Sequence, residues 1–359
     1  MKILILANND VGLYQFRREL IGELLKENSV VISLPYGELV KPLQEMGCRF
    51  IDTSLERRGL NPFKDLKLLK QYSAMIKQEH PDLVITYTIK PNVYGGFVCR
   101  IKKIPYAVNI TGLGTAFQRD GMLRKLVTAM YKLGLKKADT VFFENSENEH
   151  IFLEENIVKK EQVCLLNGAG VNLNHYYAAE YPADDGSIRF LFVGRVMKEK
   201  GIEELFAAMK MLLADGINCS LDVLGGYEEN YKEQMDTYTD EGWLYYHGYQ
   251  KDVRPFITNA HCFVLPSWHE GMANTNLECA AMGRPVITSN IHGCLEAVED
   301  SISGFLCEKN NVSSLYRAMK QFVNLSHEKK KEMGLAGRRR MEGLFDKRVV
   351  IENTICRLK

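Results

Sequence analysis

The amino-acid sequence predicts an α/β protein made of two Rossmann-like domains in tandem. Short apolar, β-branched runs alternate along the chain with longer segments whose apolar residues recur every three or four positions. The alternation is interrupted once, at the turn-rich stretch Asn172–Ser187, and then resumes. The length of 359 residues suits two domains of about 150–200 residues each. We therefore expect one domain over residues 1–172, a second over 173–345, and a C-terminal helix over 346–359 that could pack back onto the first domain.

In the first domain, several apolar runs have the length and composition of strands. They are Lys2–Ala7, Val30–Leu34, Arg49–Asp52, Leu83–Tyr87, Tyr106–Ile110, Thr140–Phe143 and Val163–Leu166. After the third run, the segment Phe63–Glu79 places apolar side chains three or four positions apart, which is the period of a helix. Pro91 and Pro105 fall at an expected helix start and an expected strand start, where proline is tolerated.

The second domain repeats this alternation. Strands are expected over Ile188–Val193, Cys219–Leu224, Leu244–His247, Cys262–Leu265 and Val286–Thr288. Helical spacing is found over Ile202–Leu213, Val253–Asn259, Asn274–Met282, Val312–Val323 and Lys347–Arg357. Strands that alternate with helices predict right-handed crossovers and a parallel, doubly wound sheet in each domain. Such sheets bind ligands beyond the carboxyl ends of their strands, so we expect the functional loops to face a cleft between the two domains.

Composition and charge argue against several classes of protein. The 46 Lys and Arg residues nearly balance the 45 Asp and Glu residues, so no overall basic field indicates a nucleic-acid partner. No apolar run approaches the roughly 18–20 residues of a membrane span, and we expect the N-terminal segment to be a strand, not a signal peptide. The nine cysteines include no CxxC pair, which favours reduced, buried thiols in a cytosolic protein.

The loop after the expected strand Ile188–Val193 carries two cations. Arg195 and Lys200 bracket a short turn, and a helix is expected to begin near Gly201. Cationic side chains and backbone N–H groups at a helix N-terminus suit a phosphate or a diphosphate. A solvated charged loop is the alternative that this segment alone leaves open.

Two glutamates follow the expected strand Cys262–Leu265. Glu270 lies in the loop, and Glu278 lies about one turn into the following helix. Gly271 permits close approach of a ligand to the backbone, and the amides of Met272–Thr275 should face the cleft. Because carboxylates accept hydrogen bonds from hydroxyl groups, one for a sugar and one for a ribose would complete a nucleotide-sugar site. The spacing of the two glutamates alone is common by chance.

Together with Gly283-Arg284-Pro285-Val286-Ile287, Gly304-Phe305-Leu306 and Asn167–Asn172, these loops resemble the family-4 retaining glycosyltransferases of the GT-B fold. The resemblance covers nearly the whole chain, and the motifs come in the expected order. It implies that Arg195 and Lys200 bind the donor diphosphate and stabilise charge on the leaving nucleotide. It further implies that Glu270 holds hydroxyls of the donor sugar and that Glu278 holds the ribose hydroxyls.

The same resemblance implies the remaining donor contacts. Gly12 would sit close to the diphosphate, and the Gly225-Gly226 turn and Gly248-Tyr249 would flank the base. The other donor-binding residues that it implies are Gly194, Gly271, Met272, Ala273, Asn274 and Thr275. We expect no metal and no cofactor beyond the nucleotide sugar itself, because two cations and a helix terminus can replace a divalent ion and no DxD tripeptide is present. His247 and His269 fit no metal-ligand pattern, and we expect each to pack or to form hydrogen bonds.

On the acceptor side, Thr88–Gly96 and Asn109–Phe117 each follow a strand. Both resemble a bacterial subgroup of the family that extends sugars on undecaprenyl diphosphate in capsule, O-antigen and protein-glycosylation pathways. Many family members carry a histidine near the second segment, and this chain does not. The acceptor candidates are Lys90, Asn92, Thr111 and Gly112, with Arg57 and Arg58 as residues that could reach the acceptor diphosphate or simply be solvated.

The segment Arg119–Lys137 combines an apolar stripe with basic residues. Such a helix can lie on an anionic membrane surface, or it can be an ordinary domain helix with its charges in water. A lipid-linked acceptor favours the membrane reading, and we expect a cytoplasmic protein that is peripheral at the inner face of the cell membrane. The basic runs Lys329–Lys331 and Arg338–Arg340 are expected to form a solvated helix face.

We therefore expect a retaining transferase that moves a hexose or N-acetylhexosamine from a nucleoside-diphosphate sugar, with UDP favoured, to an undecaprenyl-diphosphate-linked saccharide. Three alternatives stay open at this stage. They are a nucleotide-sugar epimerase on the same fold, a mannosyl-type transferase that uses a GDP-sugar, and a non-catalytic nucleotide-binding subunit.

Overall fold

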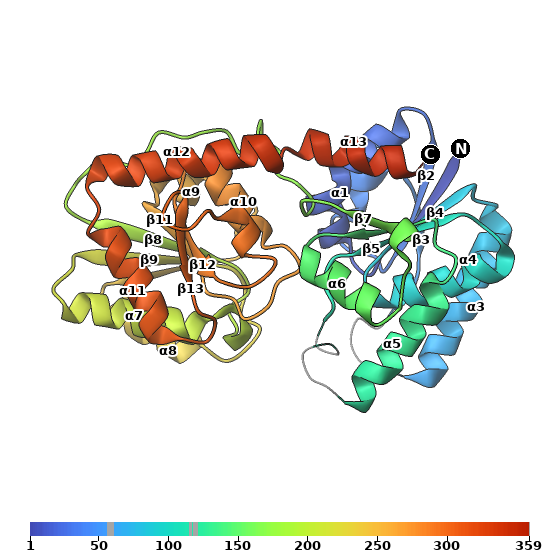
Figure 1. Cartoon of the computed structure of the whole chain (residues 1–359), viewed down its shortest axis with the longest axis horizontal. Coiled ribbons are helices and arrows are strands. Elements are labelled where there is room, and N and C mark those ends of the chain that lie inside the picture. Colours follow the sequence, from blue (N-terminus) through green and yellow to red (C-terminus); the bar gives the residue numbers. More distant parts are fainter. Residues whose placement is uncertain (56–60, 115–116, 118–120, 359) are drawn as a thin grey trace. The chain divides into compact units, whose positions relative to one another are not determined.

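The chain forms two compact units, each built around a parallel sheet with helices on both faces (Figure 1). The computed structural model describes residues 1–55, 61–114, 117 and 121–358. Unit 1 comprises Met1–Ala169 together with Val349–Lys359, and unit 2 comprises Gly170–Arg348. The predicted pair of parallel α/β domains is therefore confirmed.

The sheet of unit 1 has the strand order β3-β2-β1-β4-β5-β6-β7, and every pairing among the described residues is parallel. Its strands are β1 (Lys2–Leu6), β2 (Ser29–Leu34), β3 (Arg49–Asp52), β4 (Leu83–Tyr87), β5 (Tyr106–Ile110), β6 (Thr140–Phe143) and β7 (Val163–Leu165). Its helical segments are α1 (Asp10–Leu25), α2 (Val40–Glu45), α3 (Pro62–Glu79), the π-helical turn η1 (Pro91–Gly95), α4 (Gly96–Lys102), α5 (Met122–Leu135), α6 (Ser146–Glu154), η3 (Lys160–Gln162) and α13 (Lys347–Leu358).

Side-chain alternation along the central strands divides the core of unit 1 between the two faces of the sheet. Leu4 and Leu6 of β1 pack into a cluster with α3, α4, α5 and α6, whereas Ile3 and Ile5 pack into a second cluster with α1 and α2. Helix α13 adds Ile351 to this second cluster, although it lies far along the chain. Strands buried on both faces explain the nearly continuous apolar runs in the sequence.

The sheet of unit 2 has the order β10-β9-β8-β11-β12-β13 and is also parallel throughout the described residues. Its strands are β8 (Ile188–Val193), β9 (Cys219–Leu224), β10 (Leu244–Gly248), β11 (Cys262–Leu265), β12 (Val286–Ser289) and β13 (Gly304–Cys307). Its helical segments are η4 (Lys198–Lys200), α7 (Ile202–Ala214), α8 (Lys232–Asp240), α9 (Arg254–Asn259), α10 (Asn274–Ala281), η5 (Leu295–Ala297), α11 (Val312–Val323) and α12 (His327–Leu344).

The first six strands of unit 1 and the six strands of unit 2 have the same order in their sheets. In each sheet the first three strands are added toward one edge and the later strands toward the other, so the order reverses between β1 and β4 in unit 1 and between β8 and β11 in unit 2. Loops that leave the carboxyl ends of two such neighbours diverge to opposite faces and open a crevice, where doubly wound sheets bind ligands. The topology therefore points to the loops after β1 and β4 and the loops after β8 and β11.

Two simpler expectations can be compared with the structure. All nine cysteines are free thiols, and most of them are buried, as predicted. Among the described residues, none of the helices combines the length and the apolar character that a membrane span needs.

A buried arginine ties three segments of unit 2 together. The side chain of Arg284, just before β12, is fully buried, and its guanidinium donates hydrogen bonds to the backbone carbonyls of Ile257, Thr258, Ala179 and Glu180 at 2.6–3.4 Å. Burial lowers the pKa of Arg284 to about 10, so the group stays charged at neutral pH. Carbonyl dipoles, not a carboxylate, therefore compensate this charge, and in doing so they fix the end of α9 and the segment that leads into β8.

We expect Arg284→Met to lower the free energy of unfolding of unit 2 by about 2–4 kcal/mol, because several buried carbonyls lose their donor. Both tryptophans, Trp243 and Trp268, lie in unit 2, so their fluorescence in a urea titration measures this unit.

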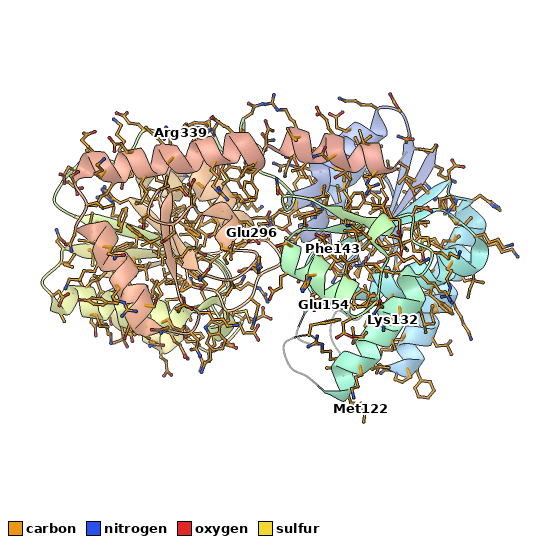
Figure 2. The ribbon with its side chains drawn as sticks, in the orientation of Figure 1. Met122, Lys132, Phe143, Glu154, Glu296 and Arg339 are labelled. Carbon is orange, nitrogen blue, oxygen red and sulfur yellow. The ribbon has the colours of Figure 1, made fainter. Side chains whose placement is uncertain are left out.

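Arg339→Met is the matched control for this substitution. Arg339 lies on the outer side of α12 and is exposed (Figure 2), so the free energy of unfolding should change by no more than about 0.5 kcal/mol. Equal effects of the two substitutions would contradict the structural role of Arg284.

Candidate functional site

Two loops at the carboxyl edge of the sheet in unit 2 lie in direct contact. They follow β8 and β11, the neighbouring strands at the reversal point. Gly201, at the end of the first loop, has a φ of +72°, and a Cβ built there would lie 2.1 Å from the carbonyl oxygen of Pro266 in the second. The backbone N–H of Trp268 donates to the carbonyl of Glu199 at 2.9 Å. Glycine at 201 is thus required both by the backbone conformation and by the close approach.

This contact brings together two of the residues predicted from the sequence. The ammonium group of Lys200 forms an ion pair with Oε1 of Glu270, although the two residues are 70 positions apart. The hydroxyl of Ser267 donates to the same carboxylate oxygen at 2.8 Å. The side chains are only 18% and 12% exposed, so both charges lie mostly out of water and face each other. The electrostatic interaction is stronger here than it would be at an open surface.

Arg195, the second predicted cation, is more exposed. Its guanidinium lies 3.5 Å from the carboxylate of Glu228, in the loop after β9, and 54% of its side chain is accessible. Ion pairs of this exposed kind contribute about 0–1 kcal/mol, so an incoming anion can replace the carboxylate at small cost. The neighbouring Lys198 is paired with Glu203 and lies 5.9 Å from the ring centroid of Trp268.

The start of α10 corrects one expectation. The sequence led us to expect the amides of Met272–Thr275 to be presented to a ligand. In the structure, the N–H of Ala273 donates to the carbonyl of Gly293 at 2.7 Å, and that of Asn274 donates to the carbonyl of Met272 at 3.0 Å. The side chains of Met272 and Ala273 are buried. Two of these four amides are therefore used by the fold itself, because the loop folds back on the residues before η5.

Glu278 lies on α10 about one turn after its first residue, as predicted, and its side chain is half-buried. Asn276 on the same helix is fully buried, and its amide donates to the hydroxyl of Thr288 at 3.1 Å. That hydroxyl in turn donates to the carbonyl of Leu265 at 2.8 Å. This chain of hydrogen bonds fixes α10, and with it Glu278, to the ends of β11 and β12.

The glycines expected near the nucleotide have strained or crowded positions. Gly225 has a φ of +136°, and a Cβ there would lie 1.9 Å from the carbonyl oxygen of Gly194. Gly248 has a φ of +62°, and Tyr249 beside it is 62% exposed. The ends of β8 and β9 thus come close together because Gly225 lacks a side chain, whereas at Gly248 only the positive φ favours glycine, since a Cβ there would meet open space. Contact of these residues with a base stays a prediction.

The histidine expectation is confirmed for His247. Its Nε2 lies 2.6 Å from the carboxylate of Asp222, and its ring lies 4.7 Å from that of Phe256. His269 is exposed, and its role stays a prediction. Within the described part of the chain, no three His, Cys, Asp or Glu side chains are placed to hold a metal ion.

In unit 1, the predicted acceptor residues follow β4 and β5. The ammonium of Lys90 bonds the carboxylate of Asp65 at 2.8 Å, and both side chains are nearly buried. Asn92 is 1% exposed, and its amide donates to the carbonyl of Asn109, so this side chain supports the strand ends and does not present itself at the surface. Thr88 has a φ of +72°, which is rare for a β-branched residue.

The remaining predicted residues of unit 1 are Thr111, Gly112, Gly12, Arg57 and Arg58. Thr111 and Gly112 are partly exposed. The amide of Gly12 donates to the side chain of Asn9 at 2.6 Å, as part of the cap of α1. Arg57 and Arg58 lie outside the described residues.

Two pairs of interacting polar side chains have no counterpart among the predicted residues. Arg17 on α1 and Glu144, directly after β6, form a buried ion pair, and the guanidinium lies 5.2 Å from the ring centroid of Tyr87. Burial alone would lower the pKa of Arg17, but the charge of Glu144, the hydrogen bond to it and the neighbouring Tyr87 together outweigh burial and raise the pKa. In unit 2, Trp268 donates to the buried carboxyl of Glu204 at 3.3 Å, and burial raises the pKa of Glu204. For the Arg17–Glu144 pair, the sequence offered one signal, since Glu144 directly follows the expected strand Thr140–Phe143.

Comparison with known proteins identifies two family models that match this chain. The model of the family described as "Glycosyl transferase 4-like" matches residues 2–145, and that described as "Glycosyl transferases group 1" matches residues 177–340. The N,N'-diacetylbacillosaminyl-diphospho-undecaprenol alpha-1,3-N-acetylgalactosaminyltransferase of Campylobacter jejuni is 26% identical over 332 residues, which cover 88% of this chain and 87% of the relative.

Further relatives extend the comparison. The UDP-Gal:alpha-D-GlcNAc-diphosphoundecaprenol alpha-1,3-galactosyltransferase of Escherichia coli is 28% identical over 73% of this chain and 71% of its own. The crystal structure of Anabaena HepE in complex with UDP and glucose superposes with a TM-score of 0.83 at 14% identity, covering 100% of this chain and 99% of that one. A glycosyltransferase from Rickettsia africae gives a TM-score of 0.80 at 19% identity, over 100% and 97% of the two chains. Since the two family models together span most of both units, the chain belongs to the glycosyltransferases of the GT-B fold, with a glycosyltransferase 4-like domain followed by a group 1 domain.

Proposed function

We propose that this glycosyltransferase moves a hexose or N-acetylhexosamine from a UDP-sugar to a saccharide carried on undecaprenyl diphosphate, with retention of anomeric configuration and without a metal ion. The names of the Campylobacter and Escherichia relatives specify undecaprenyl-diphosphate acceptors and alpha-linked products, and the Escherichia name specifies UDP-Gal as donor. The common UDP-hexoses are alpha-linked at the anomeric carbon, so an alpha product corresponds to retention. A capsular polysaccharide glycosyltransferase of Staphylococcus aureus, 25% identical over 82% of this chain, supports a place in the assembly of bacterial surface glycans.

The observation that carries this proposal is the Lys200–Glu270 ion pair between the loops after β8 and β11. Departure of UDP from the anomeric carbon builds negative charge on the β-phosphate. A cation held in place before the reaction stabilises that charge without having to reorganise. Lys200 supplies such a cation. The exposed Arg195, two residues after the end of β8, supplies a second, movable one. These two cations take the place of a divalent ion in the proposed reaction.

Glu270 has two roles in this proposal. Its Oε1 accepts from both Lys200 and Ser267, which fixes the carboxylate, and the group can accept further hydrogen bonds from hydroxyls of the donor sugar. A sugar held by Glu270 and a diphosphate held by Lys200 would place the anomeric carbon between them. Glu278, one turn along α10, would hold the ribose hydroxyls.

The acceptor would bind near the end of β4 in unit 1. There the backbone of Thr88 is held at a positive φ, and a π-helical turn follows at Pro91–Gly95. Both features are locally unfavourable, and both are found preferentially at functional sites. The buried Lys90–Asp65 pair fixes this turn against α3.

Lys200→Ala and Glu278→Ala are each expected to abolish measurable transfer while the fold is kept, because charge stabilisation in the transition state and ribose binding are lost. Removal of one such preorganised group typically lowers kcat by about 10²–10³-fold. Transfer is measured with a UDP-sugar and a synthetic undecaprenyl-diphosphate saccharide, and the fold by circular dichroism.

Lys198→Ala is the matched control, since Lys198 lies in the same loop and pairs with Glu203 at the loop surface. Its turnover should stay within a few-fold of the unmodified chain. Near-normal turnover of Lys200→Ala would contradict the assignment.

Nucleotide choice is tested by thermal stabilisation with a panel of UDP- and GDP-sugars. A saturating UDP-sugar should raise the Tm by about 2–4 °C or more, and a GDP-sugar should not. Stabilisation by GDP-sugars only would favour the mannosyl-type alternative.

Incubation with the donor alone, followed by NMR, separates the proposed transferase from an epimerase, because only an epimerase converts the sugar without an acceptor. The same NMR measurement on the transfer product reads the anomeric configuration.

We also propose that unit 1 contacts the inner face of the cell membrane through α5. Met122, Leu123, Leu126 and Leu133 are 48–87% exposed, which is unusual for apolar side chains on one helix. Met122 lies at the free tip of α5 in Figure 2. The basic residues of the same helix would interact with anionic headgroups, each contributing about 1 kcal/mol near the surface. A lipid-linked acceptor would then be presented from the same surface.

Leu123→Gln with Leu126→Gln is expected to lower co-sedimentation with vesicles of equal parts phosphatidylcholine and phosphatidylglycerol by about tenfold or more. The reason is that two exposed apolar side chains, which the lipid would cover, are lost from the contact. The matched control is Leu335→Gln with Leu344→Gln, two leucines on α12 that are 43% and 46% exposed. Equal losses from the two pairs would show that α5 has no special part in the contact.

A further inference from the structure

Trp268 connects the two loops that carry the Lys200–Glu270 ion pair. Its backbone N–H donates to the carbonyl of Glu199 at 2.9 Å, which joins it to the loop after β8. Its indole Nε1 donates to Oε1 of Glu204, in the first turn of α7, at 3.3 Å. Trp268 is thus held by its backbone and by its side chain, and it lies two positions before Glu270 in the sequence.

Glu204 is an unusual partner for this indole. The residue is 5% exposed, and Oε2 of its carboxyl has no hydrogen-bond partner in the described part of the chain. Lys198, a cation whose charge acts on Glu204, is itself paired with Glu203 at 3.5 Å. Burial raises the pKa of Glu204, because the charged form is desolvated. A carboxyl in this state makes the folded chain less stable at neutral pH than an apolar side chain of similar size would.

The fold of α7 does not explain this carboxyl. Negative charge in the first turn of a helix is favourable because of the helix dipole, but the more exposed Glu203 already supplies it. The hydrogen bond that Glu204 accepts from another side chain in the described part of the chain is the one from Trp268. The orientation of the indole is therefore the contribution that remains to be explained.

We propose that Glu204 is a positioning residue for the donor sugar and acts through Trp268 on Glu270. The segment from Ser267 to Glu270 is short, so the direction of the indole and the position of the carboxylate depend on each other. While Glu204 holds the indole, the carboxylate of Glu270 stays in contact with Lys200 and Ser267, with its remaining lone pairs directed at the sugar. The inference rests on the proposed function and deepens it.

The expected effect is confined to the sugar half of the donor. In the proposed site Glu270 holds the sugar, whereas Glu278 holds the ribose. Loss of the Glu204 contact should therefore weaken binding of the UDP-sugar and leave binding of UDP alone unchanged. A residue that only stabilised unit 2 would change both affinities together, so the difference between the two ligands separates a positioning role from a structural one.

Two substitutions at position 204 test this difference by calorimetric titration with UDP and with the UDP-hexose or UDP-N-acetylhexosamine that raises the Tm most. Glu204→Leu removes the acceptor for the indole, so the Kd of the UDP-sugar should rise about tenfold and that of UDP should change by less than about twofold. The Tm at neutral pH should stay the same or rise, because a desolvated carboxyl is removed. Glu204→Gln keeps an acceptor oxygen and should keep both Kd values.

Equal losses of affinity for UDP and for the UDP-sugar in Glu204→Leu would overturn the positioning role. So would a loss of sugar affinity in Glu204→Gln as large as that in Glu204→Leu, because the hydrogen bond from Trp268 would then not be the cause.

The indole itself gives a second measurement. The chain has two tryptophans, so NMR of isotope-labelled tryptophan gives two indole signals, which Trp268→Phe assigns. Glu204→Leu should shift the Trp268 signal and speed its exchange with solvent, because the indole N–H loses its acceptor. An unchanged Trp268 signal would show that Glu204 does not hold this side chain and would overturn the inference.

Glu241→Leu is the matched control. Glu241 accepts from Nε1 of Trp243, the other tryptophan, at 2.7 Å. It precedes β10 and so lies at the amino edge of the sheet, opposite the loops of the candidate site. This substitution should shift the Trp243 signal and leave the Kd values of UDP and of the UDP-sugar unchanged.

Glu270→Ala separates this inference from the proposed function. If it leaves the Kd of the UDP-sugar unchanged, the proposed sugar contact is wrong, and the inference fails with it. If Glu270→Ala weakens binding of the UDP-sugar but Glu204→Leu does not, only the positioning role is overturned. These titrations need no acceptor, so a wrong acceptor assignment would not affect them.

Discussion

The candidate site of unit 2 depends on one backbone contact, the approach of Gly201 to the carbonyl of Pro266. The contact lies beyond β8 and β11, the two neighbouring strands between which the strand order reverses. Two loops that would otherwise diverge are therefore held together at their ends. Any side chain at position 201 would both strain the backbone and push the loops apart. The ion pair between Lys200 and Glu270 is a consequence of this contact, since each partner lies next to one of the touching residues or a few positions beyond it.

A second property follows from the charges near this contact. Lys200, Arg195 and Lys198 each have a carboxylate neighbour, supplied by Glu270, Glu228 and Glu203. Without a ligand, the cations are thereby held in place at little electrostatic cost. In the proposed reaction, a diphosphate exchanges one set of anionic contacts for another, so the binding free energy is a difference between two favourable states. The more exposed Arg195 would exchange most easily, and the enclosed Lys200 would move least.

Much of the fold could be predicted from the sequence, because strands buried on both faces have a strong apolar signal. The limits of β4, β5 and β6 agree with the expected ranges. Strand β13 was missed as a strand, since it begins at a glycine, which is depleted in strands. Helix α8 was missed because only Met235 and Tyr238 of its residues are buried, too few to give a helical period.

Prediction of the site was less complete, for a physical reason. Arg195, Lys200, Glu270 and Glu278 follow strands, and the topology of parallel sheets makes that position informative. The partners that orient these groups could not be found in this way. Trp268 and Glu228 act through contacts between separate segments, and Ser267 donates to Glu270 within one loop. Ala273 and Asn274 use their amides on the carbonyls of Gly293 and Met272. Such pairings depend on three-dimensional loop geometry, which has no periodic trace in the sequence.

The place of α13 bears on how the molecule is made. Its residue Ile351 completes a cluster with Ile3, Ile21 and Ile32, which are synthesised before unit 2. All residues of unit 2 leave the ribosome before Ile351 does. The second sheet can therefore finish folding while one face of the first is still incomplete, and the nascent first unit has to stay protected from aggregation during that interval.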